Sequence, residues 1–419
     1  GTRQVAQLKK DTAVRLRGGV KSPILTQAAK GDTLEILEQM ETWSKVKTAD
    51  SVIGYVENKR LGDITEETET PVTDYQEPEY TALTSDSKIC LGWHSIGGAG
   101  GNDTLYSMVS GTKGMNVIAP TWFSLADTEG NITSIADTDY VQYAKQAGLE
   151  VWAVLRDFHG GINSYDETYE VLSYSSKRAK VIDQVIAAAL QSQVDGINLD
   201  FELISSKCGV HYIQFVRELS VKCRENNLVL SVDNYVPKPY NTQYDLKEQA
   251  AVADYVFIMA YDEHTDGSNE AGSVASISYL ENGVTDALKL VPKEKLVAAI
   301  PFFTRLWKET PKTEEELAAE AGTEAADYPN SVSSQALGMD EAAQAVQNAG
   351  VTAQWDDETK QNYAKWEADG STYRIWLEDM QSLEEKMKVI RQNELAGVAE
   401  WSLGRENSGV WDLILQYLN

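Results

Sequence analysis

The stretch Val194-Asp195-Gly196-Ile197-Asn198-Leu199-Asp200-Phe201-Glu202 has the pattern of a buried β-strand whose acids lie on one face. Side chains alternate across a strand, so Ile197, Leu199 and Phe201 share one face and the polar residues beside them share the other. The apolar face requires a covering layer of helices. The acids must then point into a cavity, because buried carboxylates without partners or solvent are costly. The stretch therefore predicts an acidic strand that lines an active site.

The spacing Asp-Gly-x-x-x-Asp-x-Glu resembles the signature strand of glycoside hydrolase family 18, the chitinases and related N-acetylglucosaminidases. Asp195, Asp200 and Glu202 occupy its acidic positions. The resemblance implies that this strand is the fourth of a (β/α)8 barrel and that Glu202, at its carboxyl end, is the general acid. Asn198 stands where most members place a further Asp, as is compatible with activity in the spore-cortex-lytic branch. A surface strand with solvated acids is the alternative interpretation.

From Lys88 onward, apolar segments alternate with amphipathic ones, as strands and helices do in a parallel α/β fold. The segments predicted as strands are 89–96, 116–123, 151–158, 196–203, 228–236, 255–262, 296–303 and 397–403. The amphipathic segments between them include 177–193, 212–226, 382–391 and 410–418. Eight strands are the number that a closed (β/α)8 TIM barrel needs, and we assign residues 86–419 to it.

The gap between the seventh and eighth predicted strands is too long for a βα loop. Within it, the sequence predicts a helix over 339–347 and strands around 353–355, 363–366 and 373–376. We expect a small α+β insertion over residues 304–373. It resembles the insertion that walls one side of the substrate groove in many family members.

Residues 3–62 form a separate unit, in which short alternating segments separated by turns predict a small antiparallel all-β barrel. The Lys30-Gly31-Asp32 turn and the strand from Trp43 to Val46 resemble bacterial SH3-like domains, which often tether hydrolases to cell walls. A passive spacer or an intramolecular docking module is the alternative. Residues 63–85 are acidic, rich in threonine and interrupted by proline, which predicts a linker.

Further motifs follow the carboxyl ends of predicted strands, where a barrel active site is built. Met259-Ala260-Tyr261-Asp262 resembles the family's Met-x-Tyr-Asp, and Trp401-Ser402-Leu403-Gly404 resembles the stretch whose Trp floors the sugar site. The stretch from Pro301 to Trp307 resembles the family's Pro-x-x-x-Arg-x-Trp. The expected catalytic residues are Glu202, Asp200, Tyr261 and Asn198, and the expected substrate contacts are Trp401, Asp262, Asn234, Tyr235, Arg305 and Trp93. Tyr261 and Trp401 could instead be core residues.

The resemblance implies a retaining, substrate-assisted hydrolysis, in which the carbonyl oxygen of the substrate's 2-acetamido group attacks the anomeric carbon. Glu202 would donate the proton and later activate water, Asp200 would accept the acetamido N–H, and Tyr261 would hold the carbonyl oxygen. We expect Asn198 to donate a hydrogen bond that keeps Asp200 ionised. The expected substrate is peptidoglycan or a cortex-like wall polymer, with chitin as the alternative. A non-catalytic glycan-binding protein is the other hypothesis.

Composition narrows the possible partners. The chain has 64 acidic and 37 basic residues, and a net charge of −27 argues against nucleic acid or an anionic membrane as partner. Cys90, Cys208 and Cys223 are too few and too scattered for a disulfide framework or a zinc cluster, and the histidines show no ligand spacing, so we expect no metal and no cofactor.

No apolar run is long enough to span a bilayer. The sequence shows no signal-like segment, but a leader could have been removed before Gly1, and with a wall glycan as the expected substrate we expect an extracellular or wall-associated protein.

Overall fold

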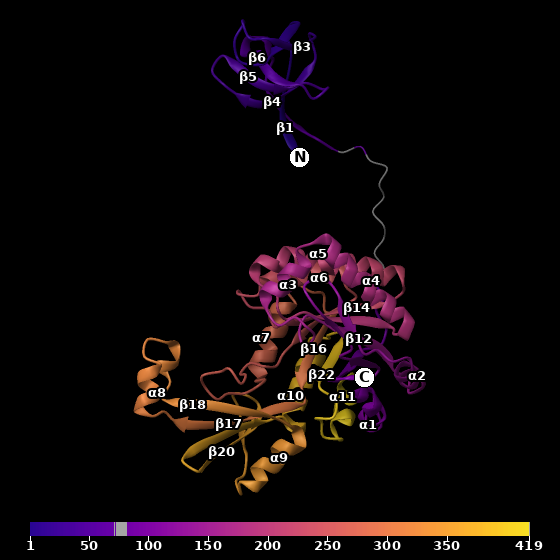
Figure 1. Ribbon diagram of the computed structural model, residues 1–419, viewed down its shortest axis with the longest axis vertical. Helices are drawn as coiled ribbons and strands as arrows, with labels where there is room; N and C mark the ends of the chain where they lie inside the picture. Colours follow the sequence, from indigo (N-terminus) through magenta and orange to yellow (C-terminus); the bar gives the residue numbers. More distant parts are fainter. Residues whose placement is uncertain (71, 73–81, 419) are drawn as a thin grey trace. The chain divides into compact units, whose positions relative to one another are not determined.

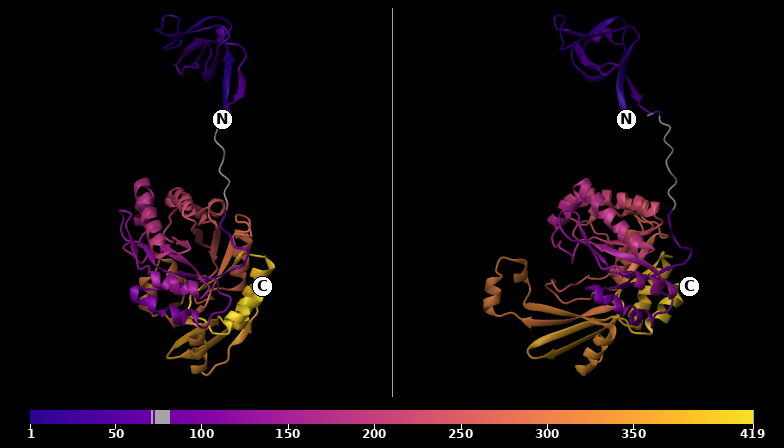
Figure 2. Two further views of the ribbon diagram at one scale, coloured as in Figure 1. Left: turned by 90° about the vertical axis from the view of Figure 1, so that its right-hand side faces the viewer. Right: turned by 45° about the vertical axis from the view of Figure 1, so that its right-hand side comes forward.

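The computed structural model of the protein describes residues 1–70, 72 and 82–418. The chain divides into two compact units between residues 79 and 80. The first unit consists mainly of strands, and the second combines strands with helices (Figures 1 and 2). Among the described residues, no helix has both the length and the apolar character that crossing a bilayer requires.

The first unit is an antiparallel sheet of seven strands. In order across the sheet, these are β3 (Ile24–Ala28), β2 (Thr12–Arg15), β6 (Ile53–Glu57), β5 (Trp43–Lys47), β4 (Thr33–Gln39), β1 (Thr2–Gln7) and β7 (Thr65–Thr68). Alternate residues of the strands, including Val14, Val46 and Val56, are buried in a common core. The predicted SH3-like all-β unit is confirmed, and β1, β3 and β7 are strands that the sequence pattern did not reveal.

The sequence predicts a linker over residues 63–85, but residues at both ends of this segment are hydrogen-bonded to a folded unit. Its first part contains β7, which pairs with β1 and so belongs to the sheet of the first unit. At its other end, the backbone N–H of Leu83 donates to Asp254 Oδ1 at 2.7 Å. Hydrogen bonding therefore fixes residues whose composition alone suggests a solvated chain. The middle of the predicted linker, residues 71 and 73–81, lies outside the described residues.

The second unit is built on a closed barrel of eight parallel strands. Around the barrel, these are β8 (Ile89–His94), β9 (Val117–Pro120), β12 (Glu150–Arg156), β13 (Gly196–Asp200), β14 (Val229–Tyr235), β15 (Tyr255–Met259), β16 (Leu296–Pro301) and β22 (Gly397–Trp401). Pairing of β22 with β8 and of β9 with β12 closes the ring. The short strands β10 (Phe123–Leu125) and β11 (Ile132–Ser134) extend from β12. The predicted (β/α)8 barrel is confirmed, and each strand ends before its predicted limit because its last residues turn into a loop.

Helices lie around the outside of the barrel (Figures 1 and 2). They are α1 (Leu105–Val109), α2 (Thr138–Gln146), α3 (Tyr165–Leu172), α4 (Ser175–Ser192), α5 (Gly209–Glu225), α6 (Leu246–Val252), α7 (Ile277–Ala287), α10 (Met380–Gln392) and α11 (Val410–Leu418). Four of them, α4, α5, α10 and α11, correspond to the helices that the sequence predicts. Their apolar faces cover the outer side of the strands, as a parallel sheet requires.

Strand β13 shows how alternation divides the interior. Ile197 and Leu199 lie in the large core between the barrel and its helices. Asn198 lies on the other face, where it bonds to Trp93 of the smaller core inside the barrel. The two faces are those that the sequence predicts, so the acidic face of β13 points toward the barrel axis.

The insertion between β16 and β22 is a five-stranded antiparallel sheet that extends away from the barrel (Figure 1). Its strands, in order, are β18 (Asn330–Gly338), β17 (Phe303–Pro311), β21 (Ser371–Leu377), β20 (Gln361–Ala368) and β19 (Gln354–Asp356). Helix α9 (Met339–Asn348) packs on this sheet, and α8 (Glu314–Ala319) lies between β17 and β18. The insertion predicted over 304–373 thus has a sheet that spans residues 303–377.

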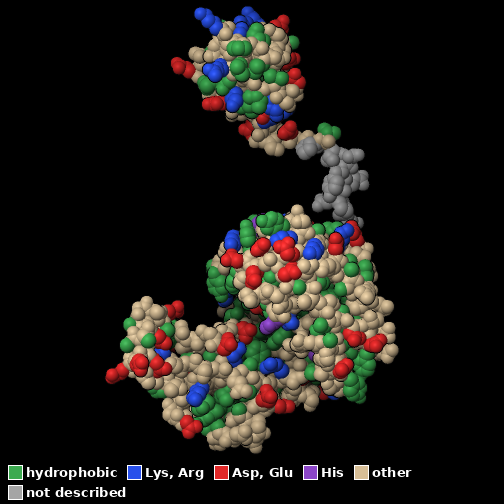
Figure 3. Space-filling view, in the orientation of Figure 1, with side chains coloured by type: hydrophobic (Ala, Val, Ile, Leu, Met, Phe, Trp, Pro, Cys, Tyr) green, Lys and Arg blue, Asp and Glu red, His purple; other side chains and the backbone are tan. Residues whose placement is uncertain are grey.

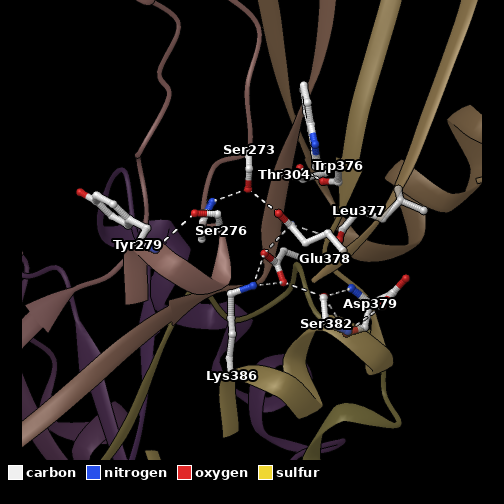
Figure 4. A network of polar contacts seen from close by, with 12 residues as sticks. Ser273, Ser276, Tyr279, Thr304, Trp376, Leu377, Glu378, Asp379, Ser382 and Lys386 are labelled. Atoms are coloured by element: carbon white, nitrogen blue, oxygen red, sulfur yellow. Dashed lines mark hydrogen bonds and ion pairs between the residues drawn. The ribbon is translucent and has the colours of Figure 1, made fainter. Parts of the chain in front are cut away.

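A buried polar network ties the insertion to the barrel (Figure 4). Lys386 of α10 donates to both oxygens of Glu378, at 2.9 and 3.2 Å, and both side chains are almost fully buried. Gln361 of β20 also donates to Glu378, at 3.0 Å, and in turn accepts a hydrogen bond from Ser273. Ser273 belongs to the loop between β15 and α7. The network therefore joins the insertion, α10 and a loop that begins at the carboxyl end of a barrel strand.

Replacing Lys386 by methionine should destabilise the protein strongly. Because removal of one partner leaves a buried charge uncompensated, we expect the free energy of unfolding to fall by about 3–5 kcal/mol. Urea denaturation followed by tryptophan fluorescence measures the change. Lys388→Met is the matched control on the same helix, because Lys388 pairs with Glu385 in a partly exposed position that water can reach. Equal effects of the two substitutions would contradict the importance assigned to the buried pair.

Candidate active site

A cavity of about 190 Å³ opens at the carboxyl ends of the barrel strands. Six strands or the loops directly after them supply its lining: Trp93, Ser95, Arg156, Phe158, His159, Asp200, Glu202, Asp233, Tyr235, Met259, Tyr261, Asp262 and Trp401. Acidic side chains and a histidine are visible in the hollow between the helical shell and the insertion (Figure 3). The cavity brings together most of the site residues that the sequence predicts.

A larger cavity, of about 640 Å³, lies at the amino-terminal ends of the strands. Its lining includes Ser87, Asn116, Glu150 and Asp195, and it contains none of the predicted site residues. In (β/α)8 barrels the chemistry is built from the loops at the carboxyl ends, and the amino-terminal ends serve stability. We therefore assign the chemistry to the smaller cavity.

Glu202 lies just beyond the end of β13 and is half-buried. The hydroxyl of Tyr235, on the neighbouring strand β14, donates to Glu202 Oε2 at 2.7 Å. Burial raises the pKa of the Glu202 carboxyl, the bond from Tyr235 lowers it, and the negative charge of Asp262 raises it. The balance keeps the pKa of Glu202 above its usual value, which favours a carboxyl that can carry a proton for transfer.

Asp157 holds the backbone around Glu202 in place. Its carboxylate accepts the backbone N–H of Glu202 at 2.8 Å, that of Leu203 at 2.9 Å and the hydroxyl of Thr168 at 3.1 Å. Asp157 is fully buried, and this burial raises its pKa to about 7 despite the three donors. The turn that leads away from β13 thus depends on a carboxylate supplied by β12.

Asp200 lines the cavity, but its Oδ1 atom is enclosed and lacks a hydrogen-bond partner. Burial raises the pKa of Asp200 well above its usual value. The negative charges of Glu202, Asp233 and Asp157 act in the same direction, and Arg156 opposes them. A carboxyl in these surroundings retains a proton until a cation or a hydrogen-bond donor arrives.

The expected hydrogen bond from Asn198 to Asp200 is wrong. Asn198 Nδ2 donates instead to Ser231 Oγ and to Asp233 Oδ1, both at 2.8 Å, and its Oδ1 accepts from Trp93 Nε1 at 3.0 Å. The side chain is fully buried and does not line the cavity. The physical reason is that the amide reaches across to β14 rather than along its own strand, so Asn198 positions other residues and faces no substrate.

Aromatic side chains form one side of the cavity. Trp401 is half-buried, and its ring lies 6.0 Å from that of Trp93, at an angle of 57°. Tyr261 is buried among the inner core residues and still lines the cavity. Flat apolar rings beside carboxyl groups suit a ring-shaped ligand with both apolar faces and polar edges.

The expected substrate contact by Asn234 is wrong, because the side chain lies on the outer face of β14. Asn234 and Gln249 exchange two hydrogen bonds of 2.8 Å each, and Asn234 is 1% exposed. Its neighbours Asp233 and Tyr235 lie on the opposite face and line the cavity. Alternation along β14 explains the difference, since adjacent residues of one strand cannot both face the axis.

Arg305 and Asp262 occupy the rim. Asp262 is exposed and lines the cavity. Arg305 lies on β17 of the insertion, where its Nη1 donates to Ser334 at 2.9 Å and its Nε is buried without a partner. Arg305 does not line the cavity, although its charge lowers the pKa of Asp262, which burial raises. Arg305 therefore acts on Asp262 through its charge and not through a cavity contact.

Three charged residues at the site were not predicted from the sequence: Arg156, Asp157 and Asp233. All three belong to segments that the sequence predicts as strands, and all lie near the carboxyl ends of those strands. Charged residues at such positions are a usable signal, because the carboxyl end of a barrel strand seldom carries a charge without a function. Asp233 could also have been found by strand alternation, which places its side chain on the same face as the predicted substrate contact Tyr235.

The chain matches the models of two protein families. The family model described as "Glycosyl hydrolases family 18" matches residues 158–406, more than half of the chain. The model described as "Bacterial SH3 domain" matches residues 10–62. The two matches fall in the two compact units.

Among curated relatives, the chain is similar to the uncharacterized glycosylase YvbX of Bacillus subtilis (strain 168). The two are 24% identical over 312 residues, which cover 72% of this chain and 84% of YvbX. The cortical fragment-lytic enzyme of Bacillus anthracis is 22% identical over 322 residues, covering 74% of this chain and 70% of that protein.

Two solved structures share the fold. The spore cortex-lytic enzyme SleL of Bacillus cereus superposes with a TM-score of 0.67 at 17% identity, covering 82% of this chain and 76% of SleL. A chitinase from Chromobacterium violaceum ATCC 12472 superposes with a TM-score of 0.66 at 21% identity, covering 79% of this chain and 99% of the chitinase.

Asp157 should make the stability of the protein depend on pH. Its folded pKa of about 7 lies above the ordinary value of 3.8, so between these values the unfolded chain loses a proton that the folded chain retains. The contribution of Asp157 to stability is thus present below about pH 4 and decreases as the pH rises toward 7, by up to about 1.4 kcal/mol per pH unit.

Denaturant unfolding at a series of pH values, for the wild type and for Asp157→Asn, measures this contribution. We expect the free energy of unfolding of the variant to fall less steeply between pH 4 and pH 7 than that of the wild type. Parallel curves would show that Asp157 is ionised throughout that range.

Proposed function

Because the chain belongs to family 18 of the glycosyl hydrolases, as its motifs predicted, it is a glycoside hydrolase of N-acetylglucosamine-containing glycans, and we propose that the substrate's acetamido group is its nucleophile. In this reaction the acetamido carbonyl oxygen attacks the anomeric carbon while the glycosidic oxygen leaves. An oxazolinium ion forms, and water opens it with overall retention of configuration. The observation that carries the proposal is the half-buried Glu202, held by Tyr235 at the mouth of the cavity.

Each cavity residue has a place in this reaction. Glu202, whose pKa is raised by burial, donates its proton to the leaving oxygen and afterwards removes one from the attacking water. Asp200, two residues earlier on the same face of β13, accepts the acetamido N–H and stabilises the positive charge that develops there. Tyr261, just after β15, lines the cavity and donates to the acetamido oxygen, and Trp401 stacks against the sugar ring.

The groove around Glu202 favours a polymer over a monosaccharide. A second cavity, of about 580 Å³, shares Glu202, Tyr235 and Asp262 with the first. Its lining includes Tyr165 and Tyr240, which are 52% and 78% exposed. Glu202 therefore lies between two binding spaces, as a proton donor between two sugar units must. Exposed tyrosine rings suit the apolar faces of the sugars on the leaving side.

We assign a bacterial wall glycan, peptidoglycan or spore cortex, as the substrate. Support comes from the cortical fragment-lytic enzyme of Bacillus anthracis among the relatives, and from the SH3-like unit. Chitin offers the same N-acetyl group and is the second candidate, supported by the structural likeness to a chitinase. The same considerations make an extracellular or wall-associated location our proposal.

Replacing Glu202 by glutamine should remove the proton donor and leave the cavity intact. We expect the turnover of a fluorogenic N-acetylchitooligosaccharide to fall by about 10²–10⁴-fold, since a positioned general acid contributes about that much. Glu281→Gln, the same chemical change on the exposed side of α7, is the control and should retain full activity.

Mass spectrometry of the products from purified peptidoglycan and from chitin oligomers then identifies the substrate. Reducing-end N-acetylglucosamine released from peptidoglycan supports the wall assignment, and products from chitin alone favour the second candidate. If the wild type binds these glycans and cleaves none of them, the protein is a glycan-binding module on a hydrolase barrel and the proposed reaction is wrong.

The SH3-like unit is the proposed attachment to the wall. Residues 1–62 carry 11 basic and 7 acidic residues, and residues 63–70, which include β7 of the same sheet, add four acids, so residues 1–70 have a formal charge of zero. The charge of −27 therefore belongs to the rest of the chain. An anionic wall polymer repels the acidic unit and does not repel the neutral one.

A shallow groove on this unit marks a contact face. It has a volume of about 630 Å³, and Leu16, Arg17, Met40, Trp43 and Tyr55 are among its lining residues. Lys45 lies opposite Tyr55 in the neighbouring strand. Within the part of the chain that the structure describes, neither Arg17 nor Lys45 forms an ion pair. Aromatic rings flanked by free cations suit a glycan strand whose peptides carry carboxylates.

Reversal of two charges on this face should release the full-length protein from the wall. We expect Arg17→Glu with Lys45→Glu to reduce the fraction that sediments with purified walls several-fold, and the binding of the wild type to weaken as salt is added. Lys9→Glu with Lys10→Glu changes the net charge equally on exposed residues outside the groove. Equal loss in the two variants would show that net charge alone, and no defined face, mediates attachment.

A further inference from the structure

Strand β14 places an acid beside the acid of the signature strand. Leu199 of β13 pairs with Val232 of β14, so Asp200 and Asp233 are the next residues along two neighbouring parallel strands. Both side chains line the cavity. Asp233 is 2% exposed, and the Oδ1 atom of Asp200 is enclosed without a donor. Two carboxyl groups so placed cannot both be ionised, because like charges repel strongly where water is excluded.

A shared proton accounts for the unsatisfied oxygen. A proton between the two carboxyl groups would supply the donor that Asp200 Oδ1 lacks. Asn198 Nδ2 donates to Asp233 Oδ1 at 2.8 Å, which favours the ionised form of Asp233. Burial raises the pKa of both acids, but only Asp233 has the amide of Asn198 to lower it, so Asp200 is the more favourable place for a shared proton.

Several charged or titratable groups surround this pair. Those on the adjoining elements are Arg156 at the end of β12 with Asp157 and His159 after it, Glu202 after β13, Tyr235 of β14, Tyr261 and Asp262 after β15, and Tyr212 of α5. Arg156 is the cation of this group, and it favours the ionised form of Asp200. The acids and tyrosines surround the pair with groups that are negative or neutral, which disfavours a second negative charge.

We propose that Asp233 is a positioning residue that receives the proton of Asp200 when substrate binds. The acetamido N–H needs an acceptor, so the O–H bond of Asp200 breaks and an O–H bond forms on Asp233. The number of protons in the cavity is unchanged, and the transfer reverses when product leaves. Asp200 then faces the developing positive charge as a carboxylate. Asp233, which accepts a hydrogen bond from Asn198, thus supplies from β14 the acid that β13 lacks at position 198. The inference rests on the role proposed above for Asp200.

The pH dependence of the reaction tests this role. In Asp233→Asn, no neighbouring carboxylate remains to take the proton, so the buried Asp200 must lose it to solvent before substrate can bind. We therefore expect the acidic limb of the kcat/KM profile to move to higher pH by about one unit. A merely structural residue would lower the rate at every pH and leave the limb in place. Asp183→Asn, the same change on the exposed face of α4, is the control and should match the wild type.

A double variant separates the role of the acid from effects on folding. Asn198→Asp with Asp233→Asn returns the acid to β13 and places the amide on β14. We expect the acidic limb to return toward its wild-type position, and any activity lost in Asp233→Asn to be regained. An unchanged limb in Asp233→Asn, or a double variant that behaves like the single one, overturns the proposal. If the wild type cleaves no N-acetylated glycan, the proposed function fails; an active wild type with an unmoved limb overturns this inference alone.

Discussion

Alternation of side chains along parallel strands is the constraint on which this structure depends. In β13, Ile197 and Leu199 fill the layer beneath the helices, and that burial fixes Asn198 and Asp200 toward the axis. A shift of one residue would exchange the two faces and bury the acids among aliphatic side chains. The same alternation in β14 turns Asp233 and Tyr235 inward and Asn234 outward. Hydrophobic packing outside the barrel therefore determines which chemical groups meet inside it.

Burying several carboxyl groups in one cavity costs free energy, and the acids with the fewest hydrogen-bond donors are the ones assigned to the reaction. Asp157 is held by two backbone N–H groups and a hydroxyl, and Asp233 by an amide. Glu202 has one tyrosine hydroxyl, and Asp200 Oδ1 has no donor. The best-satisfied acids, Asp157 and Asp233, position the others, whereas the least satisfied ones, Glu202 and Asp200, are those that would act on the substrate directly. Stability and reactivity are thus distributed among four acids on three neighbouring strands.

The sequence revealed the barrel, the insertion and the main acids because those features depend on local patterns. Period-two alternation in β13 and β5 can be read directly, and motif order places Tyr261 and Trp401 at strand ends. Contacts between strands are a different matter. The partner of Asn198 depends on β14, and the role of Asp157 depends on the turn after β13, so neither follows from its own segment. The strand β7 was missed because an acidic, threonine-rich composition conceals a pairing with the far end of the unit.

The central claim is that the substrate's own amide attacks the anomeric carbon, assisted by Glu202 and Asp200. The most direct measurement compares kcat/KM for a series of fluorogenic glycosides whose N-acetyl group carries none, one, two or three fluorines. Fluorine withdraws electrons from the carbonyl oxygen, so the account predicts a stepwise fall of about an order of magnitude or more across the series. Rates that do not depend on fluorination would contradict it, because an enzyme carboxylate would then be the nucleophile.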